Sequence, residues 1–280
     1  RVTAAGVVLL AAGLAIHISI PGAMAQDSQP GDVDILDKLD QTHMAYVITG
    51  DDEVDRISRE GLNGLSNYLA NRTALEPGEP VGVDIETDQL SFYPLIYWPM
   101  SEQAPMPSEA AISRIDAYMK NGGSVLFDTR DRMDDLGGAT AGPTRRLQAI
   151  LSDLDIPPLE PVPSDHVLTK AFYLLDIFPG RYADGPLWVE ATAASEEEAT
   201  AERPARAGDG VSSILITSND FAAAWAEDEA GNRLYPTVPN DPWQREYAYR
   251  AGVNIMMYML TGNYKSDQVH IPALLERLGQ

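Results

Sequence analysis

The chain has 280 residues, 44% of them hydrophobic, which is enough for one large domain or two small ones. It carries 42 Asp and Glu against 20 Lys and Arg, and the net charge of -22 argues against a nucleic-acid partner. The chain contains no cysteine, which excludes thiol catalysis, disulfide bonds and cysteine-ligated zinc.

The first 25 residues form a hydrophobic segment of their own. Residues 2–20 carry no fixed charge, and a helix of this length would span about 28 Å, close to the thickness of a bilayer core. The sequence GAMAQ that follows has the small residues of a signal-peptidase site, so a retained transmembrane helix and a cleaved signal peptide both stay open. Arg1 before the segment and the acids after it predict that the amino end lies in the cytoplasm. The bulk of the chain is then expected on the other side of the membrane.

Residues 26–41 are polar and predict a tether, and the globular part begins at residue 42. Short runs rich in Val, Ile, Leu and aromatic residues predict strands, and apolar residues spaced three to four apart predict helices. In chain order these are strand 44–48, helix 53–70, strands 81–85 and 92–99, helix 108–121, strand 124–128, a helix over 147–154, strands 186–192 and 211–220, and helix 244–261. Pro94 predicts an edge position or a bulge at the start of its strand.

The alternation of strands and helices predicts an α/β domain over residues 42–265, with a mostly parallel sheet covered by helices on both faces. Residues 195–210 are poor in apolar side chains and predict a mobile insertion. Residues 266–280 form a short amphipathic tail.

Polar residues follow several of the predicted strands, and in an open parallel sheet these strand ends share one rim. We expect a ligand site there. Its candidate residues are Gly50, Asp51, Asp52, Trp98, Asp128, Thr129, Arg130, Asp131, Arg181 and Asn219. The two arginines would take the anionic part of a ligand, and the acids a cation or hydroxyl groups.

Asp128 stands where a nucleophile elbow would carry Ser or Cys, so two interpretations are open. As a catalytic residue it would be the base or nucleophile of a hydrolase or metal-dependent enzyme, with His166 as proton carrier. As a structural residue it would accept backbone N–H groups and pair with Arg130 or Arg132. Likewise, Trp98 could face a ligand or lie in the core, and Asp52 could simply cap a helix.

No metal or cofactor is predicted. Asp51, Asp52 and Asp128 are similar in placement to the Mg²⁺ pocket of phosphoacceptor receiver domains, but the strand at 211–220 is not followed by the lysine of that pattern. No pair of histidines has zinc-ligand spacing.

Five segments in fixed order resemble domain-of-unknown-function family 4159 over residues 42–262. They are THMAYVITGDDEVDRISREGLNGLSNYLANRT, FYPLIYWP, GGSVLFDTRD, DHVLTKAFYLLDIFPGR and SSILITSNDFAAAW.

The resemblance implies a class I glutamine amidotransferase-like, flavodoxin-like fold, with VLFDTRD at the place of the glutaminase nucleophile. It also implies the carboxyl-terminal part of a bacterial membrane protein of the aerotolerance-regulator (Bat) type. We therefore expect a domain of the bacterial cell envelope that residues 2–20 tether to the inner membrane, with residues 26–280 on the periplasmic side. We expect it to bind or assemble with protein partners in a membrane complex, without glutaminase activity.

Overall fold

The computed structural model describes residues 41–132, 142–192, 199–200 and 210–278, with side chains up to residue 260. The predicted hydrophobic helix at 2–20 and most of the insertion at 195–210 lie outside these ranges. Among the residues that are described, no helix has the length and the apolar character needed to cross a membrane.

The core of the molecule is one seven-stranded sheet in the order β2-β1-β3-β4-β7-β6-β5. The strands are β1 Ala45–Val47, β2 Val81–Val83, β3 Leu95–Pro99, β4 Ser124–Asp128, β5 Leu159–Pro161, β6 Trp188–Glu190 and β7 Ile214–Thr217. The run from β2 to β7 is parallel, and β6 and β5 add an antiparallel edge. The predicted mixed α/β fold with a mostly parallel sheet is therefore confirmed.

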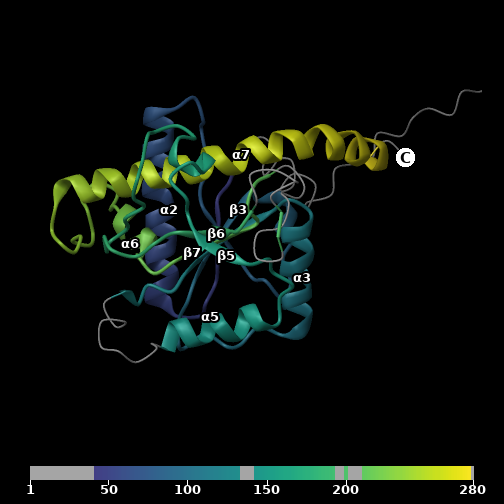
Figure 1. Cartoon of the computed structure of the whole chain (residues 1–280), viewed down its shortest axis with the longest axis horizontal. Helices are drawn as coiled ribbons and strands as arrows, with labels where there is room; N and C mark the ends of the chain where they lie inside the picture. The colour runs from purple at the N-terminus through teal and green to yellow at the C-terminus, as the bar shows by residue number, and fades with distance from the viewer. Residues whose placement is uncertain (1–40, 133–141, 193–198, 201–209, 279–280) are drawn as a thin grey trace, which may run out of the picture.

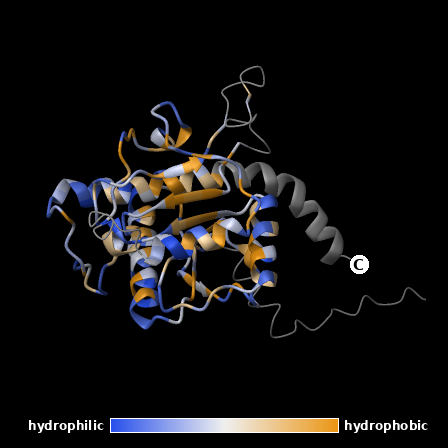
Figure 2. Ribbon diagram, turned by 60° about the horizontal axis from the view of Figure 1, so that its bottom comes forward, coloured by the Kyte–Doolittle hydropathy of each residue, from blue (hydrophilic) through white to orange (hydrophobic). Residues whose placement is uncertain are grey.

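Helices cover both faces of this sheet (Figure 1). They are α2 Asp52–Arg72, α3 Glu109–Lys120, α5 Gly142–Ser152, α6 Phe221–Trp225 and α7 Pro242–Leu278, with short 3-10 helices η1 Leu90–Phe92 and η2 Val167–Thr169. One apolar core joins the sheet to α2, α6 and α7, and a second joins it to α3 and α5. The strands appear as an apolar layer between more polar helices in Figure 2.

The central strand β4 serves both cores because its side chains alternate. Leu126 belongs to the core under α2 and α7, whereas Val125 and Phe127 belong to the core under α3 and α5. All five residues of β4 are buried. A parallel strand covered on both faces reads as a continuous apolar run, which is the pattern seen in SVLFD.

Two helices that the sheet brings together pack through glycine. A Cβ atom on Gly61 of α2 would overlap the carbonyl group of Ala222 in α6, and a Cβ on Gly64 would overlap the carbonyl oxygen of Trp225. The absence of a side chain at these positions lets α6 lie directly on α2. The start of α6 follows β7, whose last residue, Thr217, pairs with Asp128 at the carboxyl end of β4.

Several elements differ from the sequence prediction, among them the short helix α6, which was not predicted. Pro94 lies directly before β3, which is a fully buried interior strand and neither an edge nor a bulge. Its carbonyl oxygen still accepts the N–H of Ser124 in β4, so the missing N–H of the proline does not interrupt the pairing. Strand β5 was not predicted. Helix α7 continues to Leu278, through the predicted tail.

Candidate functional site

The carboxyl ends of the parallel strands form one rim, and Asp128 lies at its centre. As the last residue of β4 it pairs with Pro99 of β3 on one side and with Thr217 of β7 on the other. Its side chain is fully buried. The structure thus places the candidate catalytic carboxylate in the middle of the sheet, beside the turn that follows β7.

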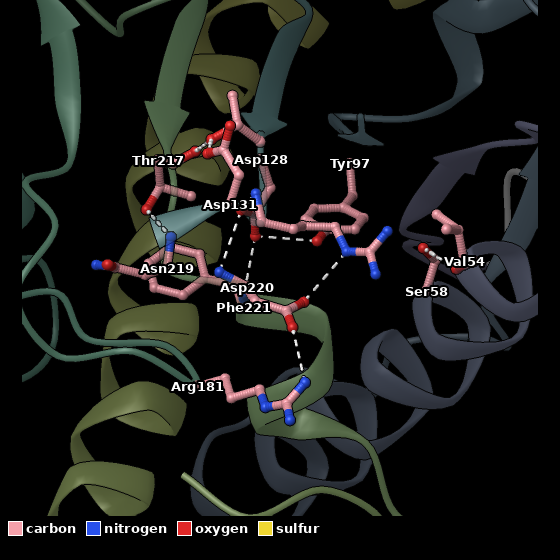
Figure 3. A network of polar contacts seen from close by, with 12 residues as sticks. Val54, Ser58, Tyr97, Asp128, Asp131, Arg181, Thr217, Asn219, Asp220 and Phe221 are labelled. Atoms are coloured by element: carbon pink, nitrogen blue, oxygen red, sulfur yellow. Dashed lines mark hydrogen bonds and ion pairs between the residues drawn. The ribbon is translucent and has the colours of Figure 1, made fainter. Parts of the chain in front are cut away.

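Both oxygens of the Asp128 carboxylate are occupied by donors (Figure 3). Oδ1 accepts the backbone N–H groups of Arg130 and Asp220, each at 3.1 Å. Oδ2 accepts the N–H of Phe221 at 2.7 Å and the hydroxyl of Tyr97 at 3.0 Å. The carboxylate therefore ties β4 and β3 to the first residue of α6.

Two donors to Asp128 come from residues with unusual backbone geometry. Arg130 and Asp220 are non-glycine residues with φ of 61° and 55°, in the left-handed region. Such a conformation costs of the order of 1–3 kcal/mol and persists only where the surroundings enforce it. Here the enforcing contacts are the bonds from both N–H groups to Asp128.

The same two residues also form an ion pair. Nε of Arg130 lies 3.4 Å from Oδ1 of Asp220, and Nη1 of Arg181 lies 3.6 Å from Oδ2. One buried carboxylate thus serves two guanidinium groups, whose side chains are 19% and 28% exposed. Figure 3 shows the side chain of Arg181 next to the carboxylate of Asp220, with a dashed line between them.

Burial raises the pKa of Asp128 to about 7, and the negative charge of Asp220 acts in the same direction. Burial also raises the pKa of Asp220, although the two arginines oppose this shift. For Arg130, burial alone would lower the pKa, but the combined effects of Asp220, Tyr97 and Asp128 outweigh burial and raise it. The cluster therefore combines two guanidinium groups with two carboxyl groups whose pKa values are both raised.

Asp131 and Thr129 have structural partners. Asp131 accepts the hydroxyl of Thr129 at 2.5 Å and both the N–H and the hydroxyl of Thr144 in the first turn of α5. Both residues are buried. Asp131 therefore fastens the start of α5 to the end of β4.

Asn219 positions the loop that carries Arg181. Its amide nitrogen donates to the carbonyl oxygens of Phe178 and Gly185, and its Oδ1 accepts the N–H of Gly185 at 3.0 Å. Gln244 of α7 supports the same loop by donating to the carbonyl oxygen of Arg181 at 2.8 Å. Asn219 is fully buried, and its hydrogen bonds hold the loop that contains Arg181 against the end of β7.

The candidates at the end of β1 cap a helix or lie at the surface. Asp51 is the N-cap of α2, and its second oxygen accepts the hydroxyl of Ser101, which follows β3. Gly50, with φ of 76°, and Asp52 are exposed.

Trp98, another candidate, lies in the core. Its ring is stacked on Phe127 with the centroids 5.3 Å apart, and only 4% of the residue is exposed.

The structure does not bring His166 to Asp128. His166 caps η2, and its ring lies edge-on to Tyr258 of α7. The Tyr258 hydroxyl accepts the N–H of Ser212, which precedes β7, whereas Asp128 is level with Thr217 at the other end of that strand. Five residues of extended chain correspond to about 16 Å.

No group of three or more His, Asp or Glu residues with the geometry of a metal site occurs within the described ranges. Two members of the Asp128 cluster were absent from the predicted set, namely Tyr97 and Asp220. Asp220 is the last residue of a predicted strand, as Asp128 is, so its position at the rim was a usable signal. The Tyr97 hydroxyl carries no such signal, because an aromatic residue inside a strand normally indicates core.

The sequence profile described as "Domain of unknown function (DUF4159)" matches residues 43–260. The chain therefore belongs to this family. A search of curated proteins gave no match.

Proposed function

We propose that this domain is a binding or assembly module of a bacterial cell-envelope protein, and that Arg130 and Arg181 recognise an anionic group on its partner. The observation that carries the proposal is that the carboxylate of Asp128 is buried and fully occupied by hydrogen-bond donors. The residue at the reactive corner of the sheet is a buried structural acceptor, and the partly exposed groups beside it are guanidinium groups.

The contacts of Asp128 argue against turnover. A nucleophile or general base needs a free lone pair within reach of the substrate. Each oxygen of Asp128 already accepts two hydrogen bonds, and the side chain is fully buried. The left-handed residue that follows β4 is Arg130, which carries no nucleophilic group. With His166 beside Tyr258, the hydrolase alternative loses its proton carrier as well.

The arginine pair supports recognition of an anion. Two guanidinium groups share the single carboxylate of Asp220. Among the described residues, the buried Nε of Arg181 has no hydrogen-bond partner. Guanidinium groups with unused N–H donors match carboxylate and phosphate oxygens in pairs.

For the fold, we propose the flavodoxin-like arrangement of the class I glutamine amidotransferase-like group. The parallel run β2-β1-β3-β4-β7 supports it, because the fifth parallel strand takes the outer place of the order 2-1-3-4-5. A cysteine-dependent glutaminase reaction would lack its nucleophile in this chain.

We place the domain on the periplasmic side of the inner membrane, tethered through residues 2–20, in a protein of the Bat type. The uncharged segment of bilayer length and the acidic chain that follows it support this setting.

Calorimetric titration of the purified full chain with inorganic phosphate and with a hexaglutamate peptide tests the proposal. We expect saturable binding of at least one probe, weakened by salt because the contact is charged. The double variant Arg130→Gln/Arg181→Gln should bind about 10- to 100-fold more weakly, as expected for loss of charge-assisted hydrogen bonds of about 1.5–3 kcal/mol.

The matched control is Arg114→Gln. Arg114 lies on α3, on the opposite face of the sheet, where it donates to the carbonyl oxygens of Ile85 and Asp88. Equal weakening by the control, or full affinity in the folded double variant, would contradict the proposal.

A further inference from the structure

A cavity of about 320 Å³ lies at the start of α7. Its size is at the lower end of the roughly 300–1,000 Å³ typical of small-molecule sites. The lining includes Arg233, Thr237, Asn240, Asp241, Arg245 and Glu246. None of the rim residues described above lines it, so it is a separate candidate site.

Arg245 is the unusual member of this lining. Its guanidinium group donates to the carbonyl oxygens of Ala224, at 2.5 Å, and of Tyr235. In the part of the chain that the structure describes, it forms no ion pair with a carboxylate. Burial lowers the pKa of Arg245, and the positive charges of Arg233 and Arg181 act in the same direction.

A partly buried charge without a counter-ion is unfavourable, and an anion in the cavity would remove that cost. Arg233, the other arginine of the lining, already has a counter-ion. Arg233 pairs with Glu227 and donates to the Tyr249 hydroxyl at 2.6 Å. Arg245 is therefore the guanidinium group of the lining that has no ion-pair partner among the described residues, and it can take one negative charge on a ligand.

Two carboxylates, those of Asp241 and Glu246, also line the cavity and indicate the rest of the ligand. Asp241 accepts the N–H of Trp243 with Oδ1, and Glu246 accepts the Tyr68 hydroxyl and the Arg250 guanidinium with Oε1. Each retains a second oxygen. Two acids beside one unpaired arginine disfavour a dianion such as phosphate, and their free oxygens suit an N–H donor.

We propose that this cavity binds a small molecule with one carboxylate and one ammonium group, of the free amino acid class. The carboxylate lies at Arg245, and the ammonium group lies at Asp241 and Glu246. The site does not depend on anion binding at Arg130 and Arg181.

Calorimetry on the full chain with L-alanine, L-glutamine, acetate, methylammonium and inorganic phosphate tests this site. We expect at least one amino acid to bind saturably, and acetate and methylammonium to bind at least tenfold more weakly. Phosphate is titrated into the rim variant Arg130→Gln/Arg181→Gln, where it should also bind at least tenfold more weakly than the amino acid. Arg245→Gln should weaken amino acid binding at least tenfold, whereas Arg114→Gln, which also removes a guanidinium bonded to two carbonyl oxygens, should leave it unchanged.

Amide hydrogen exchange on the unmodified chain gives a readout that needs no variant. The bound amino acid should slow exchange in residues 240–246 more than in α3. The rim variant Arg130→Gln/Arg181→Gln should keep amino acid affinity within about threefold, which separates this site from the rim. Absence of amino acid binding, tighter binding of phosphate than of the amino acid to the rim variant, full affinity in folded Arg245→Gln, or protection only outside 240–246 would overturn the proposal.

Discussion

The carboxylate of Asp128 accepts the backbone N–H of Phe221 at 2.7 Å, between residues 93 positions apart in the sequence. The adjacent N–H of Asp220 reaches the other oxygen of the same carboxylate. These bonds join the end of β4 to the start of α6 and hold Asp220 in its left-handed conformation. Asp128 thereby fixes the acid that Arg130 and Arg181 both contact.

Replacing Asp128 by asparagine should destabilise the domain. The NH₂ group of asparagine cannot accept a hydrogen bond, so in either orientation at least one buried backbone N–H loses its acceptor. We expect a loss of about 1–3 kcal/mol in the free energy of unfolding, measured by urea denaturation at pH 8.

The control for this substitution is Asp116→Asn. Asp116 forms a helical i,i+4 ion pair with a 55% exposed Lys120, and such pairs contribute about 0.3–0.5 kcal/mol. If both variants change stability equally, Asp128 is not the structural acceptor described here.

The pH dependence of stability should also report on Asp128. Its pKa in the folded state is raised to about 7 from an ordinary value of 3.8. A raised pKa means that the folded state binds the proton more tightly, so the contribution to stability is complete below about pH 4 and is lost as the pH rises through about 7. The free energy of unfolding should therefore fall from pH 5 to pH 8.

Asp128→Asn should reduce this fall, because asparagine does not titrate. Urea denaturation of both proteins at pH 5, 6, 7 and 8 makes the comparison. Parallel profiles for the two proteins would show that Asp128 does not titrate in this range.

The left-handed backbone at Arg130 predicts an unusual order of stability. Arg130→Gly and Arg130→Ala remove the same guanidinium group, but only glycine adopts a φ of 61° without strain. The glycine variant should be the more stable by about 1 kcal/mol.

The same pair of substitutions at Arg114, inside helix α3, should give the reverse order, since alanine is favoured in helices by about 1 kcal/mol. Thermal or urea denaturation of the four variants tests this. Alanine more stable than glycine at both positions would rule out a strained backbone at Arg130.

The glycine contact between α2 and α6 predicts that alanine at residue 61 is harmful. Alanine is the better helix former by about 1 kcal/mol, yet its Cβ would overlap the Ala222 carbonyl group. We expect Gly61→Ala to destabilise the domain by about 1–3 kcal/mol, the usual effect of overpacking.

Asn67→Ala, at an exposed position of the same helix, is the control and should change the free energy of unfolding by less than about 0.5 kcal/mol. A stabilising Gly61→Ala would mean that α6 does not lie on α2 as described.

The sequence was most informative where burial leaves a periodic pattern. Helix 53–70 and strand 124–128 were predicted to within two residues, because their apolar residues face one or both cores. Strand β5, with the sequence LEP, has no such pattern and exists through its pairing with β6. The position of β7 between β4 and β6 depends on contacts distant in sequence, which periodicity does not encode.

The contacts at the rim could be predicted only in part. Because the carboxyl ends of parallel strands lie at one edge of a sheet, the sequence indicated that Asp128 and the end of the predicted strand 211–220 are neighbours, and the N–H of Asp220 does donate to Asp128. The sequence could not separate Asp128 and Asn219, which are buried in structural bonds, from Arg130 and Arg181, which are partly exposed. That distinction depends on hydrogen-bond partners and on left-handed backbone angles, which single-residue patterns do not report.

A crystal structure of the full chain grown in phosphate at pH 6 tests the central claim most directly. The account predicts phosphate in contact with the guanidinium groups of Arg130 and Arg181, and an Asp128 carboxylate still buried against Phe221 N–H and the Tyr97 hydroxyl. Phosphate or a water held by an Asp128 carboxylate open to solvent, with the arginines turned away, would contradict it.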